Sequence, residues 1–369
     1  MTLKVGIVGL PNVGKSTLFN ALSSAQAEAA NYAFCTIEPN VGVVPVPDVR
    51  FDALVEKVVP KKQVPATVEF IDIAGLVKGA SKGEGKGNAF LSHIRDVDAV
   101  AHVVRCFEDD NIVHVDGRID PVADIETIET ELILKDLETV QKRLDKARRA
   151  SKGKDPIEKK AVVVCEALEK ILDGGDLASN FEPNPDDTDE GSIVYDLCLL
   201  TSKPMFYVTN VSEDDAAEPS KNAHVQAVNE VGEKRGVPVV PICAAIEAEI
   251  MQLDAEDRGE FLESVGLEEP GLNDVIRTGY GMLNLITYFT AGEVEVRAWT
   301  ITRGTKAPGA AGKIHTDFER GFIKAEVMHW KDLIDLGSEA AVKSAGKMGI
   351  EGKEYVVKDG DVMHFRFNV

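Results

Sequence analysis

The chain has 369 residues, 44% of them hydrophobic, so more than one domain with its own buried core is expected. Acidic residues outnumber basic ones by 62 to 41, and the net charge of −21 argues against general binding to phosphate backbones. Five scattered cysteines, with no Cys-x-x-Cys pair, indicate free thiols in a reducing compartment. The sequence shows neither a signal segment nor a long apolar run, so we expect a cytoplasmic protein without membrane contact.

The apolar runs predict an α/β fold with a mostly parallel sheet. Helical stretches separate the runs, beginning with a helix at residues 15–25, as in repeated βαβ units. The expected strands are residues 3–8, 68–73, 99–105, 204–209 and 237–242.

Residues 121–200 interrupt this alternation. Apolar residues recur there at steps of three and four from Ile133 to Ala147 on a charged background, and a second helix is expected at 157–172. We interpret the segment as an antiparallel, coiled-coil-like arm inserted into the α/β domain. Two ordinary surface helices packed on the sheet are the alternative. The acidic, proline-rich residues 180–189 predict a solvated loop.

The pattern changes again after Met282. Short β-like runs at 294–302, 321–327 and 355–367 alternate with glycine-rich turns and predict a small mixed α+β domain. The chain is therefore expected to divide into an α/β domain (1–120 with 201–282), an inserted helical arm (121–200) and a C-terminal domain (283–369).

The strongest motif is Gly9-Leu10-Pro11-Asn12-Val13-Gly14-Lys15-Ser16, which follows the first strand and opens the first helix. Backbone N–H groups of such a loop surround a β-phosphate at a helix N-terminus. Lys15 supplies a point charge between the β- and γ-phosphates, and the Ser16 hydroxyl can ligate Mg²⁺. The loop predicts binding of a nucleoside triphosphate.

Two further segments fit a γ-phosphate and its metal. Asp72-Ile73-Ala74-Gly75 stands at the end of the 68–73 strand, where Asp72 can hold Mg²⁺ and the Gly75 N–H can sense the γ-phosphate. Thr36, about 20 residues after Ser16, can complete the metal coordination.

A fourth segment, Asn210-Val211-Ser212-Glu213, follows the 204–209 strand. Guanine-specific proteins carry Asn-Lys-x-Asp there, and the Asp accepts hydrogen bonds from guanine N1 and N2. With Val211 and Glu213 in place of Lys and Asp, guanine recognition is in doubt. Asn210 can still bond an adenine edge through N6 and N7. Cys243-Ala244-Ala245, after the last strand, is expected to be a base-contacting loop.

Together these segments resemble the translation-factor-related (TRAFAC) GTPase class, and closely its YchF subfamily of Obg-like ATPases. The resemblance implies a Ras-like P-loop domain, an inserted helical arm and a ubiquitin-like TGS domain. It also implies a preference for ATP over GTP, use of Mg²⁺ and association with the ribosome, and it extends the nucleotide-binding loop to Thr17. The matching blocks are residues 9–17, 31–40, 72–81, 210–213, 315–322 and 359–365.

Hydrolysis needs a group that orients the attacking water. Ras-like enzymes use a glutamine after the Asp-x-x-Gly motif, but Leu76 occupies that place here and cannot accept a hydrogen bond. The resemblance suggests His114 as a catalytic residue, and a structural surface histidine is the alternative. Related cation-dependent GTPases use an asparagine at the position of Asn12 as a K⁺ ligand, so K⁺ is a hypothesis beside Mg²⁺.

The leading prediction is a Mg²⁺-dependent, ribosome-associated ATPase that slowly hydrolyses ATP to ADP and phosphate. A nucleotide-gated scaffold with negligible turnover is the alternative, and a GTPase with relaxed base recognition is the third reading. The expected partner is the large ribosomal subunit or the whole ribosome. The basic turn 148–154 is a candidate contact for ribosomal RNA, with an ordinary solvated turn as the alternative, and we expect a monomer.

Overall fold

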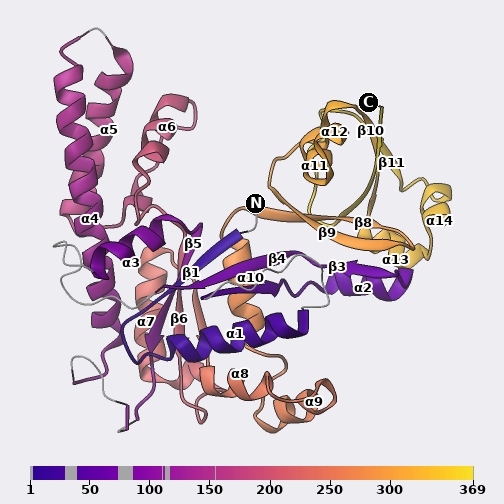
Figure 1. The fold of residues 1–369 in the computed structure, drawn as a ribbon, viewed down its shortest axis with the longest axis horizontal. Coiled ribbons are helices and arrows are strands. Elements are labelled where there is room, and N and C mark those ends of the chain that lie inside the picture. The colour runs from indigo at the N-terminus through magenta and orange to yellow at the C-terminus, as the bar shows by residue number, and fades with distance from the viewer. Residues whose placement is uncertain are drawn as a thin grey trace.

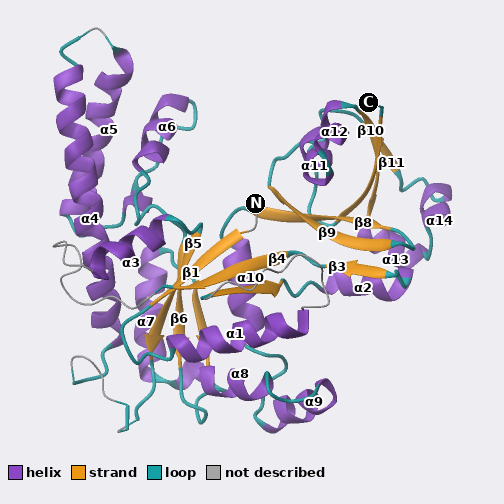
Figure 2. Ribbon diagram, viewed as in Figure 1, coloured by secondary structure: helices purple, strands orange, loops and turns teal. Residues whose placement is uncertain are grey.

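The computed structural model describes residues 3–29, 40–73, 86–109, 111–112, 117–153 and 155–368. These residues form two six-stranded sheets and a helical arm that stands away from both (Figure 1, Figure 2). The predicted class, a P-loop-type α/β domain with an inserted helical arm and a C-terminal α+β part, is confirmed.

The first sheet has the strand order β2-β4-β1-β5-β6-β7, and all neighbours run parallel except the edge pair of β2 and β4. Five of its strands agree with the sequence prediction within two residues, whereas β2 was not predicted. β5 is buried along its whole length, as a central strand covered on both faces must be. The strands are β1 (Leu3–Val8), β2 (Val41–Pro45), β4 (Thr67–Asp72), β5 (Ala99–Arg105), β6 (Met205–Asn210) and β7 (Val239–Ile242).

Helices cover this sheet on both sides and supply most of its core partners. α1 packs on β2 and β4, α7 on β6 and β7, and α10 on β5, β6 and β7. Among the described residues, no helix combines the length and apolar composition that a bilayer crossing requires. These helices are α1 (Lys15–Ala29), α3 (Lys86–Arg95), α7 (Ala223–Arg235), α8 (Ala244–Ile250) and α10 (Leu272–Gly281). α9 (Ala255–Ser264) packs on α8, and 3-10 turns lie at Pro219–Lys221 and, packed on the arm, at Ala178–Asn180.

The arm consists of α4 (Pro121–Ala150), α5 (Pro156–Asp173) and α6 (Thr188–Leu197). α4 and α5 each begin with a proline after an aspartate whose carboxylate accepts a backbone N–H of the first turn, which fixes both helix starts. The outer part of α4 shares a separate apolar core with α5 and α6. Its first turns belong to the core of the sheet through Ile125 and Ile128. The first turns of α4 therefore pack in the core of the first sheet, and the rest of the helix packs in the core of the arm.

Two buried carboxylates of α4 tie the arm to the sheet. Asp136 accepts hydrogen bonds from the backbone N–H and the hydroxyl of Thr201, at 2.8 and 2.7 Å. Glu129 accepts one from the Tyr207 hydroxyl at 2.6 Å and pairs with Arg235 of α7. Because buried carboxylates need such partners, the arm leaves the sheet at a fixed place.

The second sheet has the order β11-β10-β12-β8-β9-β3 and its own apolar core. Five of its strands come from the C-terminal part, where the sequence predicted three β-like runs. Those strands are β8 (Leu285–Ala291), β9 (Glu295–Thr302), β10 (Phe322–His329), β11 (Gly349–Glu351) and β12 (Asp361–Phe367). The helices beside them are α11 (Ala307–Ile314), α12 (Thr316–Arg320), α13 (Trp330–Leu336) and α14 (Glu339–Ser344).

The sixth strand of this sheet, β3 (Lys62–Val64), comes from the N-terminal part of the chain. It runs parallel to β9, and the preceding α2 (Val49–Val58) packs on α13, β8 and β9. Arg50 of α2 also forms an ion pair with Asp359, at 2.8 Å. Residues 49–64 therefore lie with the second sheet, although β2 and β4, which flank them in sequence, belong to the first. The sequence did not predict this exchange.

Glu247 of α8 is buried and links that helix to the start of α10. Its carboxylate accepts backbone N–H groups of Gly271 at 2.7 Å and Leu272 at 3.3 Å. Burial raises the pKa of the Glu247 carboxyl from an ordinary 4.5 to about 7, although these two hydrogen bonds act in the opposite direction. The link is therefore sensitive to pH near neutrality.

We predict that Glu247 makes the protein less stable as the pH rises. Because its pKa is higher in the folded state, its contribution to the free energy of unfolding is fully present below about pH 4.5 and is lost as the pH rises through 7. The loss amounts to about 3 kcal/mol. Urea unfolding between about pH 5 and pH 8 should show a smaller loss of stability for Glu247→Gln than for the unsubstituted protein. Equal losses in the two proteins would contradict the assignment.

Candidate nucleotide-binding site

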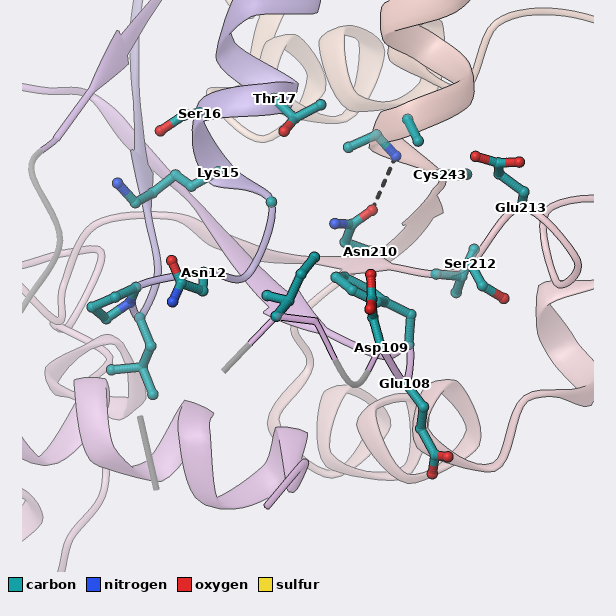
Figure 3. A pocket seen from close by; sticks show the side chains of 18 of the residues that line it. Asn12, Lys15, Ser16, Thr17, Glu108, Asp109, Asn210, Ser212, Glu213 and Cys243 are labelled. Carbon is teal, nitrogen blue, oxygen red and sulfur yellow. Dashed lines mark hydrogen bonds between the residues drawn. The ribbon is translucent and has the colours of Figure 1, made fainter. Parts of the chain in front are cut away.

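Residues 9–14 connect β1 to α1, and residues 10–12 and 14–17 border a cavity of about 890 Å³ beside the ends of β1, β5 and β6 (Figure 3). The side chains of Asn12 and Lys15 lie on one side of it in Figure 3, while Ser212 and Glu213 lie across from them. The volume is in the range of cavities that hold a mononucleotide-sized ligand. Its lining includes Asn12, Gly14, Lys15, Ser16, Thr17, Asn210, Val211 and Glu213 from the sequence prediction.

The buried Asn210 at the end of β6 holds the loop in place. Its Nδ2 donates to the Val13 carbonyl at 3.0 Å, and its Oδ1 accepts the Ala244 N–H at 3.0 Å (Figure 3). Gly14 faces the same amide and has φ +93°. A Cβ on Gly14 would lie 2.0 Å from the Asn210 Nδ2, so only glycine fits this contact. Asn210 thus joins the phosphate loop to the first turn of α8.

These two bonds limit what Asn210 can do for a base. One N–H of its amide remains to donate to purine N7, which adenine and guanine share. A bond from adenine N6 would use the second lone pair of an oxygen that already accepts from Ala244. Recognition of an adenine edge by Asn210 stays a prediction. Any further discrimination between adenine and guanine depends on other residues of the cavity.

Lys15 lies at the opposite end of the cavity, beside the end of β4. Its Nζ donates to the Asp72 carboxylate at 3.2 Å and to the Ile73 carbonyl at 3.4 Å. β1 and β4 are neighbours in the sheet with Ile7 opposite Asp72, so the sheet register sets this pairing. The Lys15 ammonium and the Asp72 carboxylate, which are expected to contact a triphosphate and its metal, therefore lie together at one edge of the cavity.

The oxygen ligands available at this edge of the cavity suit Mg²⁺. They do not suit a metal whose coordination must be completed by protein side chains alone. Ser16 lies in the first turn of α1 and Asp72 ends the neighbouring strand, so a hydroxyl and a carboxylate oxygen are available. Mg²⁺ keeps several waters and takes such oxygen ligands together with phosphates. Among the described residues, no cluster of three or more His, Cys, Asp or Glu side chains could hold a metal by itself.

The segments after β6 and β7 form the end of the cavity away from Lys15, where the sequence predicts base contacts. Val211 is buried, Ser212 donates to Asp215 at 2.9 Å, and Glu213 borders the cavity. Cys243 lies beside them, as predicted for the last loop, and burial raises the pKa of its thiol. This wall therefore combines a neutral thiol and small side chains with the carboxylates of Glu213 and Asp214.

One wall of the cavity was not predicted from the sequence. It is formed by Phe107, Glu108, Asp109 and Ile112, which follow the end of β5. The available signal was their position, since ligands of open parallel sheets bind beyond the carboxyl ends of the strands. The sequence prediction used this segment only for His114.

Three predicted residues cannot be placed. Thr36, Gly75 and His114 lie outside the described residues, and so does Leu76, on which the question of water orientation depends. Their proposed roles stay predictions.

The sheet topology, the phosphate loop and the acidic end of β4 define a P-loop nucleoside triphosphatase. Comparison with protein families agrees: the model described as "50S ribosome-binding GTPase" matches residues 4–143, and that of the YchF GTPase C-terminal domain, described as a protein of unknown function, matches residues 285–368.

Known proteins resemble the chain over its whole length. It is 56% identical to the ribosome-binding ATPase YchF of Bacillus subtilis over 369 residues, which is 100% of both chains. It is 47% identical to the Obg-like ATPase 1 of Rattus norvegicus, covering 100% of this chain and 93% of the rat protein. The solved structure of the Schizosaccharomyces pombe YchF GTPase superposes with a TM-score of 0.89 at 42% identity, over 99% and 98% of the two chains. The chain belongs to the YchF family of Obg-like ATPases, as the sequence motifs predicted.

Proposed function

We propose that this protein binds Mg²⁺–ATP, hydrolyses it to ADP and phosphate, and acts as a ribosome-associated switch in the cytoplasm. The observation that carries the proposal is one continuous cavity joining Lys15 and Ser16 to Asn210 and Glu213. The relatives from Bacillus subtilis and rat are named as ATPases, the first also as ribosome-binding.

Each residue of the loop has a separate task in this proposal. Backbone N–H groups of residues 12–17 surround the phosphates, and Lys15 places its charge between the β- and γ-phosphates. Ser16 and Asp72 hold Mg²⁺, with Thr36 as the further ligand. The metal, when bound, neutralises charge that develops on the phosphate oxygens. Lys15 and Asp72 are close enough for one to set the position of the other.

The attacking water needs an orienting group, since Leu76 offers none. We assign that task to His114, with the Gly75 N–H on the γ-phosphate, and single-turnover hydrolysis by His114→Ala at intact ATP binding tests it. Asn12, which borders the cavity with φ +64°, is the proposed K⁺ ligand. Hydrolysis rates in K⁺ and in Na⁺ test that role.

The three parts of the chain have separate roles in this proposal. Residues 1–120 with 201–282 bind nucleotide, except that 49–64 lie with the second sheet; 121–200 form the arm, and 283–369 form the TGS domain. The arm tip contacts ribosomal RNA in this proposal, and Lys142, Lys146 and Arg149 lie together there with Asp145, while Arg148 is paired with Glu166 at 3.0 Å. The ribosome, through its large subunit or as a whole, is the partner of a monomeric protein.

The proposal predicts selective ATP binding and nucleotide-dependent ribosome binding. ATP should displace a fluorescent ATP analogue at lower concentration than GTP does, and comparable or tighter GTP binding would refute the adenine assignment. Co-sedimentation with ribosomes should differ between ATP, GTP and a non-hydrolysable ATP analogue. Turnover that is negligible with and without ribosomes would instead support a nucleotide-gated scaffold, which Leu76 favours.

A further inference from the structure

Arg105, the last residue of β5, lies opposite Asn210 in the sheet and is 1% exposed. All three of its guanidinium nitrogens donate to carbonyl oxygens of the segment that follows. Nε bonds Phe107 at 3.1 Å, Nη2 bonds Asp109 at 3.1 Å, and Nη1 bonds Ile112 at 2.8 Å. One side chain therefore gathers three carbonyls of a single loop, whose described residues are 106–109 and 111–112.

The same loop is held by two further contacts. The guanidinium lies over the Phe107 ring, with its Cζ 4.5 Å from the ring centroid. The Asp109 carboxylate accepts the Asn111 backbone N–H at 2.8 Å, which closes a tight turn. A buried guanidinium keeps its charge and needs acceptors for its N–H groups, so Arg105 and the loop carbonyls depend on each other.

The loop that Arg105 gathers is the unpredicted wall of the cavity. Phe107, Glu108, Asp109 and Ile112 all border it, and Figure 3 labels Glu108 and Asp109 among the lining residues. The carbonyls bonded by Arg105 belong to three of these four residues. The guanidinium therefore lies outside the cavity lining and fixes the backbone of the residues that form this wall.

We propose that Arg105 is a positioning residue for nucleotide binding, because its three bonds to Phe107, Asp109 and Ile112 hold the wall that a bound nucleotide contacts. This inference rests on the proposed function, since it needs ATP as the occupant of the cavity. It assigns Arg105 no contact with the nucleotide. The competing view is that Arg105 only stabilises the end of β5.

Replacing Arg105 by lysine distinguishes the positioning role from a role in stability alone. Arg105→Lys keeps a positive charge and most of the apolar stem, but a single ammonium cannot span three carbonyls that a planar fork reaches. The variant should remain folded and bind ATP about tenfold more weakly, corresponding to about 1.4 kcal/mol. The effect should appear in Kd and KM more than in kcat at saturating ATP. ATP affinity is measured by displacement of a fluorescent analogue, and folding by the melting temperature.

Chemical rescue separates positioning from general stability. In Arg105→Ala, added ethylguanidinium should restore ATP affinity, whereas ethylammonium at the same concentration should not, because only the former carries the planar set of donors. The matched control is Arg143→Ala on the arm, which removes an ion pair with Glu158 at 2.9 Å far from the cavity. It should lower the melting temperature without changing ATP affinity.

The outcomes separate this inference from the proposed function. If the unsubstituted protein does not bind ATP, the proposed function falls first and this inference falls with it. If it binds ATP and Arg105→Lys binds equally well while folded, Arg105 has no positioning role and the proposed function stands. A loss of affinity in Arg105→Ala that ethylguanidinium and ethylammonium restore equally, or that neither restores, also overturns the inference.

Discussion

Gly14→Ala is expected to weaken ATP binding by about a hundredfold or more, corresponding to about 2.7 kcal/mol. The added Cβ would lie 2.0 Å from the Asn210 Nδ2, and φ +93° is unfavourable for alanine. The loop must then move, which breaks the bond between Asn210 and the Val13 carbonyl and misplaces the N–H groups that receive the phosphates. Displacement of a fluorescent ATP analogue measures the change.

The control isolates the steric contact from the backbone strain. Gly236, which ends α7 with φ +67°, has no atom within 4 Å of an added Cβ. Gly236→Ala therefore introduces similar backbone strain, about 1–2 kcal/mol, away from the cavity. It should lower the melting temperature and leave ATP affinity unchanged. If both variants lose affinity to the same degree, the contact between Gly14 and Asn210 is not the cause.

Lys15→Ala is expected to lower the rate of ATP hydrolysis by about 100- to 1,000-fold, since a fixed positive group at the developing phosphate charge is lost. The ammonium lies at the cavity edge, where it donates to the Asp72 carboxylate at 3.2 Å and to the Ile73 carbonyl at 3.4 Å. Single-turnover hydrolysis at saturating ATP measures the chemical step apart from binding.

A lysine on the arm supplies the comparison for this experiment. Lys160 pairs with Asp187 and Asp189, at 2.6 and 3.0 Å, and its replacement by alanine also removes one ammonium from an ion-paired site. Lys160→Ala should hydrolyse ATP at the unsubstituted rate. A normal rate in Lys15→Ala would show that Lys15 has no role in the chemistry, whatever its effect on ATP binding.

The nucleotide-binding loop could be predicted because its signal is local. Gly9, Gly14 and Lys15 are spaced by the geometry of one turn between a strand and a helix, so no distant residue is needed to recognise it. The strands of the first sheet were predictable for a related reason, since helices on both faces leave continuous apolar runs such as β5. Asn210 was also found, because its motif directly follows such a run.

Arg105 and the wall that it holds could not be predicted in this way. Arginine is rarely buried, and its acceptors here are backbone carbonyls, which no sequence pattern marks. The second task of Asn210, as the link between Val13 and Ala244, depends on residues far apart in sequence. Such contacts appear only when the register of the strands is known.

β3 was missed because its three residues, Lys62, Gln63 and Val64, carry almost no strand signal. Their pairing with β9 is set by residues more than 200 positions away. β2 was missed as well, since a short edge strand buries only alternate residues.

The position of β3 limits where the chain can be cut into folded fragments and how the two sheets can move relative to each other. The chain passes from the first sheet to the second before α2, returns after β3, and passes over again before β8. A fragment ending at Met282 would therefore keep β3 without its partner β9, and Phe51 and Leu54 of α2 would lose apolar cover. Three covalent crossings also deny the second sheet free rotation about a single joint. Any turn of that sheet must be taken up in the short connections 46–48, 65–66 and 282–284, of which the first two are directly attached to strands of the nucleotide-binding sheet.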